Sequence, residues 1–124
     1  MQGIGRHISS TGEVYTGLYV QGIRHGRGSL KDSNGGMYVG EFARGRRHGN
    51  GVYTNEDGEE YNGDWEDDKR HGMGYLTYAN GDALSGHWKL DTPHGDAIFI
   101  IKATGAKERR FYENGAITKR NNTI

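Results

Sequence analysis

The stretch Tyr61–Gly74 reads YNGDWEDDKRHGMG, and it decides the fold. It places an aromatic residue, a glycine and a second aromatic residue at alternate positions, followed by a charged turn, Arg-His-Gly and a further glycine. The same pattern occurs 23 residues earlier, at 38–51, and again at 15–28, and a weaker copy lies at 84–97. A constant period of this length indicates a repeat architecture.

Each copy is predicted to form a β-hairpin. Tyr15, Gly17 and Tyr19 alternate with residues of another kind, which is the period of a strand with two unlike faces. Residues that accept positive φ recur at both expected turns, with glycine at 12, 35, 58 and 81 and glycine or aspartate at 22, 45, 68 and 91. In the fifth copy both turns come one residue late, at Gly105 and Gly115. One extra residue is therefore expected between 97 and 105, as a bulge or a longer loop.

The chain of 124 residues is thus predicted to be all-β, a single-layer twisted antiparallel β-meander of stacked 23-residue hairpin repeats. We expect the repeat array to span 1–116 and a C-terminal tail to span 117–124. The array divides into a half repeat at 1–11, full repeats at 12–34, 35–57, 58–80 and 81–104, and a degenerate cap at 105–116. In the cap, either Phe111 or Tyr112 continues the aromatic column, depending on which phase is kept.

Three segments of the chain resemble the MORN repeat family (membrane occupation and recognition nexus). They are Tyr61–Trp65, Arg70–Gly74 and the turn Asn80–Asp82. The resemblance covers about residues 3–112 and implies a non-catalytic scaffold or adaptor in the cytoplasm, associated with the cytoskeleton or a ciliary or flagellar axoneme. The fourth copy departs from the family pattern at Leu84, Pro93 and Ala97.

The aromatic face of the sheet is the first candidate for binding a protein partner, because the repeats leave no segment to cover it. The alternative is that rings packed on the glycine column satisfy this face by themselves. Residues 97–101 are apolar on both faces, which predicts cover from the C-terminal residues or from a partner. The candidate partner-binding residues are Tyr19, Tyr38, Phe42, Tyr61, Trp65, Trp88 and Phe111.

A second candidate is a basic edge beside the charged turns. Such an edge could bind phosphoinositide headgroups in a membrane tether, or an acidic protein. Nucleic acid is not expected as a partner, because the net charge is zero. End strands with a free edge also offer a site at which two copies of the chain could pair as a homodimer. The candidate residues of the edge are Arg24, Arg46, Arg47, Lys69 and Arg70.

The sequence predicts no cofactor, no metal and no catalysis. The histidines at 25, 48, 71 and 94 recur once per hairpin, so neighbouring copies lie about 9.6 Å apart, too far to share one ion easily. A structural hydrogen bond from each ring to a loop is the expected role. The acidic runs lie at turns, and no nucleophile stands in a pattern with a base.

Overall fold

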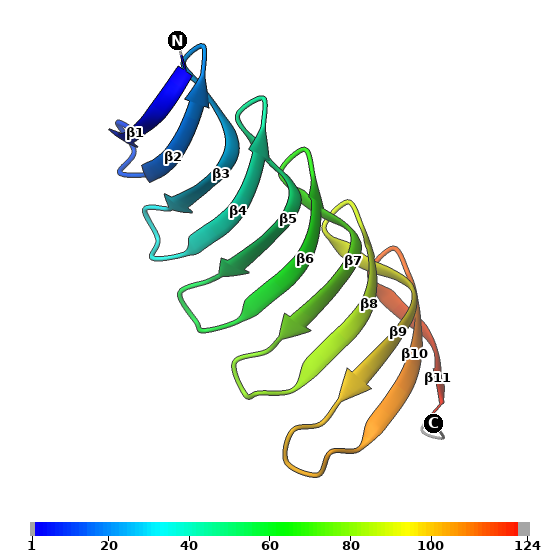
Figure 1. Ribbon diagram of the computed structural model, residues 1–124. Coiled ribbons are helices and arrows are strands. Elements are labelled where there is room, and N and C mark those ends of the chain that lie inside the picture. The colour runs from blue at the N-terminus through cyan, green and yellow to red at the C-terminus, as the bar shows by residue number, and fades with distance from the viewer. Residues whose placement is uncertain (1, 122–124) are drawn as a thin grey trace.

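The structure is a computed structural model that describes the backbone of residues 2–121 and the side chains of residues 3–118. Within that range a single antiparallel sheet contains eleven strands in sequence order. Figure 1 shows a twisted ribbon with the two termini at opposite ends. The strands are β1 (Gln2–Ile8), β2 (Val14–Val20), β3 (Ile23–Lys31), β4 (Met37–Ala43), β5 (Arg46–Thr54), β6 (Glu60–Glu66), β7 (Lys69–Thr77), β8 (Ala83–Lys89), β9 (Thr92–Ile100), β10 (Lys107–Glu113) and β11 (Ala116–Asn121).

The predicted fold class is confirmed: the described residues form one open, all-β layer. They contain no helix that is long and apolar enough to cross a membrane. Residue 1 of the expected half repeat and residues 122–124 of the expected tail lie outside the described part of the chain.

Two kinds of connection alternate along the ribbon. On one edge, two-residue turns join β2 to β3, and the same kind of turn joins the two strands of each later hairpin. Both turn residues have positive φ, as at Arg44 (52°) and Gly45 (82°). Such turns match the twist of the strands that they join. The opposite edge has five-residue loops such as 78–82, closed by a hydrogen bond from the Tyr78 N–H to the Asp82 carbonyl (2.7 Å).

The Arg-His-Gly motif forms a β-bulge. In the first hairpin Gly17 pairs with Gly28 and Tyr19 pairs with Arg24, so residues 25–27 stand opposite Leu18 alone. The middle bulge residue, Gly26, has a φ of 74°, which explains the glycine in the motif. The same register shift recurs in the next three hairpins. Because bulges bend and twist strands, the motif curves the ribbon.

A zigzag of aromatic rings forms the core. Each ring meets the next edge to face, with centroids 5.1 to 5.3 Å apart along the row from Tyr15 to Trp88. Such pairs contribute about 0.5 to 1.5 kcal/mol each beyond their buried area. The sheet therefore has a core without a second layer. In order, the row is Tyr15, Phe42, Tyr38, Trp65, Tyr61 and Trp88.

The tyrosines of this row lie on the glycines of the neighbouring strand. A Cβ built on Gly51 would overlap the ring of Tyr38, so the ring needs a glycine there. The Tyr38 hydroxyl donates a hydrogen bond to the Glu41 carbonyl opposite the bulge (2.8 Å). Burial raises the pKa of Tyr38 to about 12. Tyr61 on Gly74 repeats the arrangement.

The departures in the fourth repeat compensate for each other. Leu84 replaces the tyrosine and Ala97 replaces the glycine beneath it, and both are buried (0% and 4% exposed). The leucine side chain leaves space for the methyl group of the alanine, whereas a tyrosine ring would fill that space. The core thus continues with a different pair of residues.

The C-terminal end decides between two residues that the sequence left open. Tyr112 is 6% exposed and joins the core, whereas Phe111 is 41% exposed on the other face, so Tyr112 continues the aromatic column and the candidate Phe111 does not lie on the aromatic face. The extra residue lies in the loop 101–106, which has six residues. This residue shifts the repeat pattern by one position, which brings Tyr112 onto the aromatic face.

The predicted tail is also corrected. Residues 116–121 form β11, which pairs with β10 and extends the sheet. The described residues therefore do not fold back over Ile98 and Ile100, which stay half-buried within β9. On the aromatic face the Arg110 guanidinium lies over the Phe99 ring (3.8 Å) and binds Glu108 (2.7 Å). These charged residues end the aromatic row.

Candidate functional site: a groove on the aromatic face

Three cavities on the aromatic face share lining residues and form one groove. Their volumes are about 340 Å³ for the N-terminal cavity, 260 Å³ for the middle cavity and 490 Å³ for the C-terminal cavity. Arg24 and Leu30 line both the N-terminal and the middle cavity, and Arg47 and Tyr53 line both the middle and the C-terminal cavity. The groove therefore runs along the ribbon across successive hairpins.

The floor of the groove has a buried row and an accessible row. Tyr38 and Tyr61 are 1% and 2% exposed, because neighbouring rings cover them. The accessible row comes from the return strands and the loop that follows β7, and its side chains are half-buried. A ligand in the groove would contact this second row: Leu30, Tyr53, Leu76 and Tyr78.

Arginines line one side of the groove at intervals of one repeat. Arg24, Arg47 and Arg70 each lie over aromatic rings of the core, with Arg47 4.5 Å from the Trp65 centroid. Arg47 and Arg70 also hold carboxylates of the next turn, with Nε to Oδ1 distances of 3.2 Å to Asp68 and 3.2 Å to Asp91. These two arginines are neutralised within the chain.

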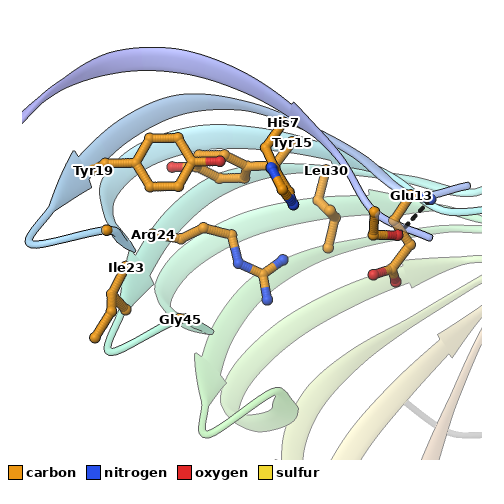
Figure 2. A pocket seen from close by; sticks show the side chains of 10 residues that line it. His7, Glu13, Tyr15, Tyr19, Ile23, Arg24, Leu30 and Gly45 are labelled. Carbon is orange, nitrogen blue, oxygen red and sulfur yellow. Dashed lines mark hydrogen bonds between the residues drawn. The ribbon is translucent and has the colours of Figure 1, made fainter. Parts of the chain in front are cut away.

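Arg24 lacks such a partner. The position equivalent to Asp68 and Asp91 is Gly45, and no described residue forms an ion pair with Arg24. The Arg24 guanidinium is 5.5 Å from the Phe42 centroid and 5.7 Å from that of Tyr15. Figure 2 shows it extending into the N-terminal cavity, with the Glu13 carboxylate at the far side.

Acidic and polar groups line the other side of the groove. Asp32 accepts hydrogen bonds from the Tyr53 hydroxyl (2.9 Å) and from the N–H groups of Gly36 (2.7 Å) and Asn34 (3.0 Å). Burial alone would raise the pKa of Asp32, but these hydrogen bonds outweigh it and lower the pKa below its ordinary value. Asp32 is therefore ionised and already partnered.

The predicted partner-binding residues do not share one environment. Tyr19 is half-buried and lines the N-terminal cavity, while Phe111 lies on the opposite face. The other five belong to the core and are 1% to 5% exposed. These five side chains are therefore buried by packing against one another and need no partner to cover them: Tyr38, Phe42, Tyr61, Trp65 and Trp88.

The predicted basic edge is mixed in charge. All five candidates lie at or next to the first residue of β3, β5 or β7, beside the two-residue turns. Arg47 and Arg70 bind aspartates, and Arg46 lies 4.0 Å from Asp67. Arg24 and Lys69 have no ion pair with a described residue. Aspartates thus offset most of the positive charge that the sequence pattern suggested.

Two histidines of the repeat column support the turns. The Nδ1 of His71 accepts a hydrogen bond from the Leu90 N–H (3.3 Å), and that of His94 accepts one from the Asn114 N–H (3.4 Å). The predicted structural role is confirmed for these two residues. In the part of the chain that the structure describes, no cluster of three potential metal ligands occurs.

Sequence reasoning did not select the accessible row of the groove as candidate binding residues. Leu30, Tyr53 and Leu76 recur at one-repeat intervals, four residues after each bulge glycine, and this spacing places them on the aromatic face. It also missed the loss of the carboxylate at Gly45, which was read only as a turn residue. Comparing each turn with the arginine one repeat before it would have found the difference.

The fold and the groove define a repeat protein of stacked β-hairpins with a shallow groove along one face. The family model described as MORN repeat matches residues 15–37, 38–60 and 61–83, which is more than half of the chain. The chain therefore belongs to the MORN repeat family. MORN repeats are generally non-catalytic binding modules. Comparison of the chain with curated proteins finds no match.

Proposed function

We propose that the chain is a non-catalytic scaffold that holds a segment of a protein partner in the groove. The observation that carries this proposal is a continuous groove whose accessible row is apolar and aromatic while the residues beneath it are already packed. Leu30, Tyr53 and Leu76 offer apolar contact area at regular intervals, and the charged rims offer positions for polar contacts. An extended segment or a helix fits such a surface better than a small molecule does.

We further propose that the partner is cytoskeletal, in the cytoplasm or in a ciliary axoneme. This step rests on the family resemblance and not on the geometry of the groove. The competing proposal, a phosphoinositide tether acting through the basic edge, is weaker because aspartates pair with Arg46, Arg47 and Arg70.

The test begins with a phage library that displays disordered segments of cytoskeletal and axonemal proteins, selected on the full chain. Enriched peptides are then measured against two matched variants by isothermal titration calorimetry. Tyr78 faces the groove and Tyr75 is 43% exposed on the opposite face. We expect Tyr78→Ser to weaken binding about tenfold, the loss typical of one good aromatic contact, and Tyr75→Ser to leave it unchanged.

Equal binding by both folded variants would rule out the groove as the docking surface. For the location, detergent fractionation of cells that express the tagged chain provides the test. Retention in the insoluble pellet with filament or axonemal proteins is expected. Release by detergent together with steeply salt-dependent vesicle binding would favour the tether instead.

A further inference from the structure

We propose that the N-terminal cavity binds the carboxylate of an aspartate or glutamate side chain from the partner segment, and that Arg24 is the residue that binds it. This inference rests on the proposed function, because the carboxylate belongs to the segment in the groove. It specifies the chemistry of one contact, and that contact fixes the position of the partner segment along the ribbon.

Three arginines occupy equivalent places in successive repeats, but only two of them have a carboxylate partner. Arg47 and Arg70 donate from Nε to an aspartate of the next turn and from a terminal nitrogen to the carbonyl of the same residue, at 2.8 Å for Asp68 and 2.6 Å for Asp91. Arg24 stands at the same place in its repeat. Glycine at 45 removes the carboxylate, and none of the described residues supplies another.

The Arg24 guanidinium is held in position by the aromatic rings beneath it. It lies over Phe42 and Tyr15, at 5.5 and 5.7 Å from the two centroids, so the rings orient its side chain toward the cavity. A guanidinium presents its donors in a planar fork that matches a carboxylate. A group that is already oriented loses less entropy when it binds.

The lining of the N-terminal cavity favours a carboxylate over a phosphate. Glu13 lines the same cavity and carries a negative charge, which disfavours the double negative charge of a phosphate more than the single charge of a carboxylate. The cavity also has apolar walls from Tyr19, Ile23 and Leu30. Its volume of about 340 Å³ holds the stem of an acidic side chain together with a neighbouring residue.

Gly45→Asp is the sharpest variant, because it copies the second and third repeats onto the first. Gly45 has a φ of 82°, close to the 71° of Asp68 and the 74° of Asp91, so an aspartate is compatible with this backbone. A Cβ at residue 45 would meet only Ile23 at an ordinary distance of 3.5 Å. The new carboxylate would occupy Arg24 and exclude that of the partner.

The experiment measures the dissociation constant of a groove-binding peptide from the phage selection. We expect Arg24→Gln and Gly45→Asp each to weaken binding about tenfold or more, the loss typical of a charged hydrogen bond. The double variant is expected to bind no more weakly than either single variant, because both changes remove one contact. Replacing the acidic residue of the peptide by glutamine should weaken binding to the unmodified chain and not to Gly45→Asp.

Two controls separate this contact from general effects. Gly115→Asp adds the same charge at the equivalent turn of the last hairpin, where Pro93 replaces the arginine, and we expect it to leave peptide binding unchanged. Without peptide, Gly45→Asp is expected to raise the thermal midpoint by about 2 to 4 °C, as a new exposed ion pair would. A circular dichroism spectrum checks that each variant is folded.

The outcomes are distinguishable. Peptides that distinguish Tyr78→Ser from Tyr75→Ser but bind Arg24→Gln and Gly45→Asp normally would overturn this inference and leave the proposed function standing. Tighter binding of a phosphoserine peptide than of its glutamate counterpart would overturn the choice of a carboxylate. Peptides that fail to distinguish the two tyrosine variants would overturn the proposed function and this inference together.

Discussion

The third and fourth repeats occupy equivalent places in the sheet, yet they are built differently. In the third, Tyr61 lies on Gly74 and donates a hydrogen bond to the Asp64 carbonyl (2.9 Å). In the fourth, Leu84 lies beside Ala97 and forms no such bond. Both arrangements are buried. The comparison shows that the pattern specifies a filled volume between strands, and that two different residue pairs can fill it.

The largest expected effect comes from breaking the third pair. In Gly74→Ala the new methyl group would overlap the Tyr61 ring, and we expect a loss of about 3 kcal/mol in the free energy of unfolding. Adding Tyr61→Leu copies the fourth repeat and should recover more than half of that loss. Chemical denaturation measures both. The control is Gly3→Ala, where a Cβ would meet no atom within 4 Å.

If the losses in the free energy of unfolding caused by Gly74→Ala and Tyr61→Leu simply add in the double variant, Leu84 and Ala97 are not a compensating pair. The coupling energy from the double-mutant cycle is therefore the quantity that decides between compensation and two independent departures.

Alkaline pH distinguishes the repeats that bury a tyrosine, such as the second and third, from the fourth, which buries Leu84 instead. Burial raises the pKa of Tyr38 and Tyr61 to about 12 from an ordinary value of 10.0. Since the unfolded chain ionises first, the stability is complete below pH 10 and declines as the pH rises through 12. We expect a loss of roughly 1 to 2 kcal/mol per phenol by pH 11. Denaturation at pH 8 and pH 11 tests this expectation.

The matched variant for the pH test is again Tyr61→Leu with Gly74→Ala. It removes Tyr61, one of the tyrosines whose pKa is raised to about 12, so its stability should fall less between pH 8 and pH 11. An equal fall in both proteins would assign the alkaline loss to other groups.

The indoles of the two repeats differ in their hydrogen bonds. The Nε1 of Trp65 donates to the Gly51 carbonyl (3.2 Å), whereas the buried Nε1 of Trp88 has no partner among the described residues. We therefore expect Trp65→Phe to cost about 1 kcal/mol more than Trp88→Phe, because only the first change removes a hydrogen bond. Thermal or chemical denaturation of the two variants gives the difference. Equal costs would mean that the Trp65 bond adds nothing.

The smallest effect concerns the arginine side of the groove. Asp68→Gly copies the first repeat onto the second and removes the acceptor of the Arg47 N–H and Nε groups. We expect a loss of about 0.5 to 1 kcal/mol, because the carboxylate is half-exposed and glycine relieves the positive φ. Differential scanning calorimetry measures the shift. A stability gain would show that the pair does not link neighbouring hairpins.

The sequence was sufficient for whatever depends on periodicity. The hairpins, both turn columns and the aromatic face follow from residue types at constant spacing. The sequence left one point open where an extra residue shifts the phase: the longer loop at 101–106 puts Tyr112 in the core and Phe111 outside it. The extent of the strands after the last repeat was also missed, since residues 116–121 carry no repeat pattern.

The candidate site was less predictable than the fold. A large aromatic residue marks both a core and a docking surface, and only the ring contacts assign Phe42 and Trp65 to the core. The sequence likewise does not show which charged residues at turns have an ion-pair partner, because Arg47 binds an aspartate 21 residues away. Contacts between successive repeats decide both questions.

The most direct test of the groove is an NMR titration of the full chain with a peptide from the phage selection. We expect side-chain signals of Leu30 and Leu76 to shift, since both line the groove. Val39 and Met73 are 44% and 52% exposed on the opposite face and should stay unchanged. Shifts confined to Val39 and Met73, or to the strand edges, would contradict the assignment of the groove as the binding surface.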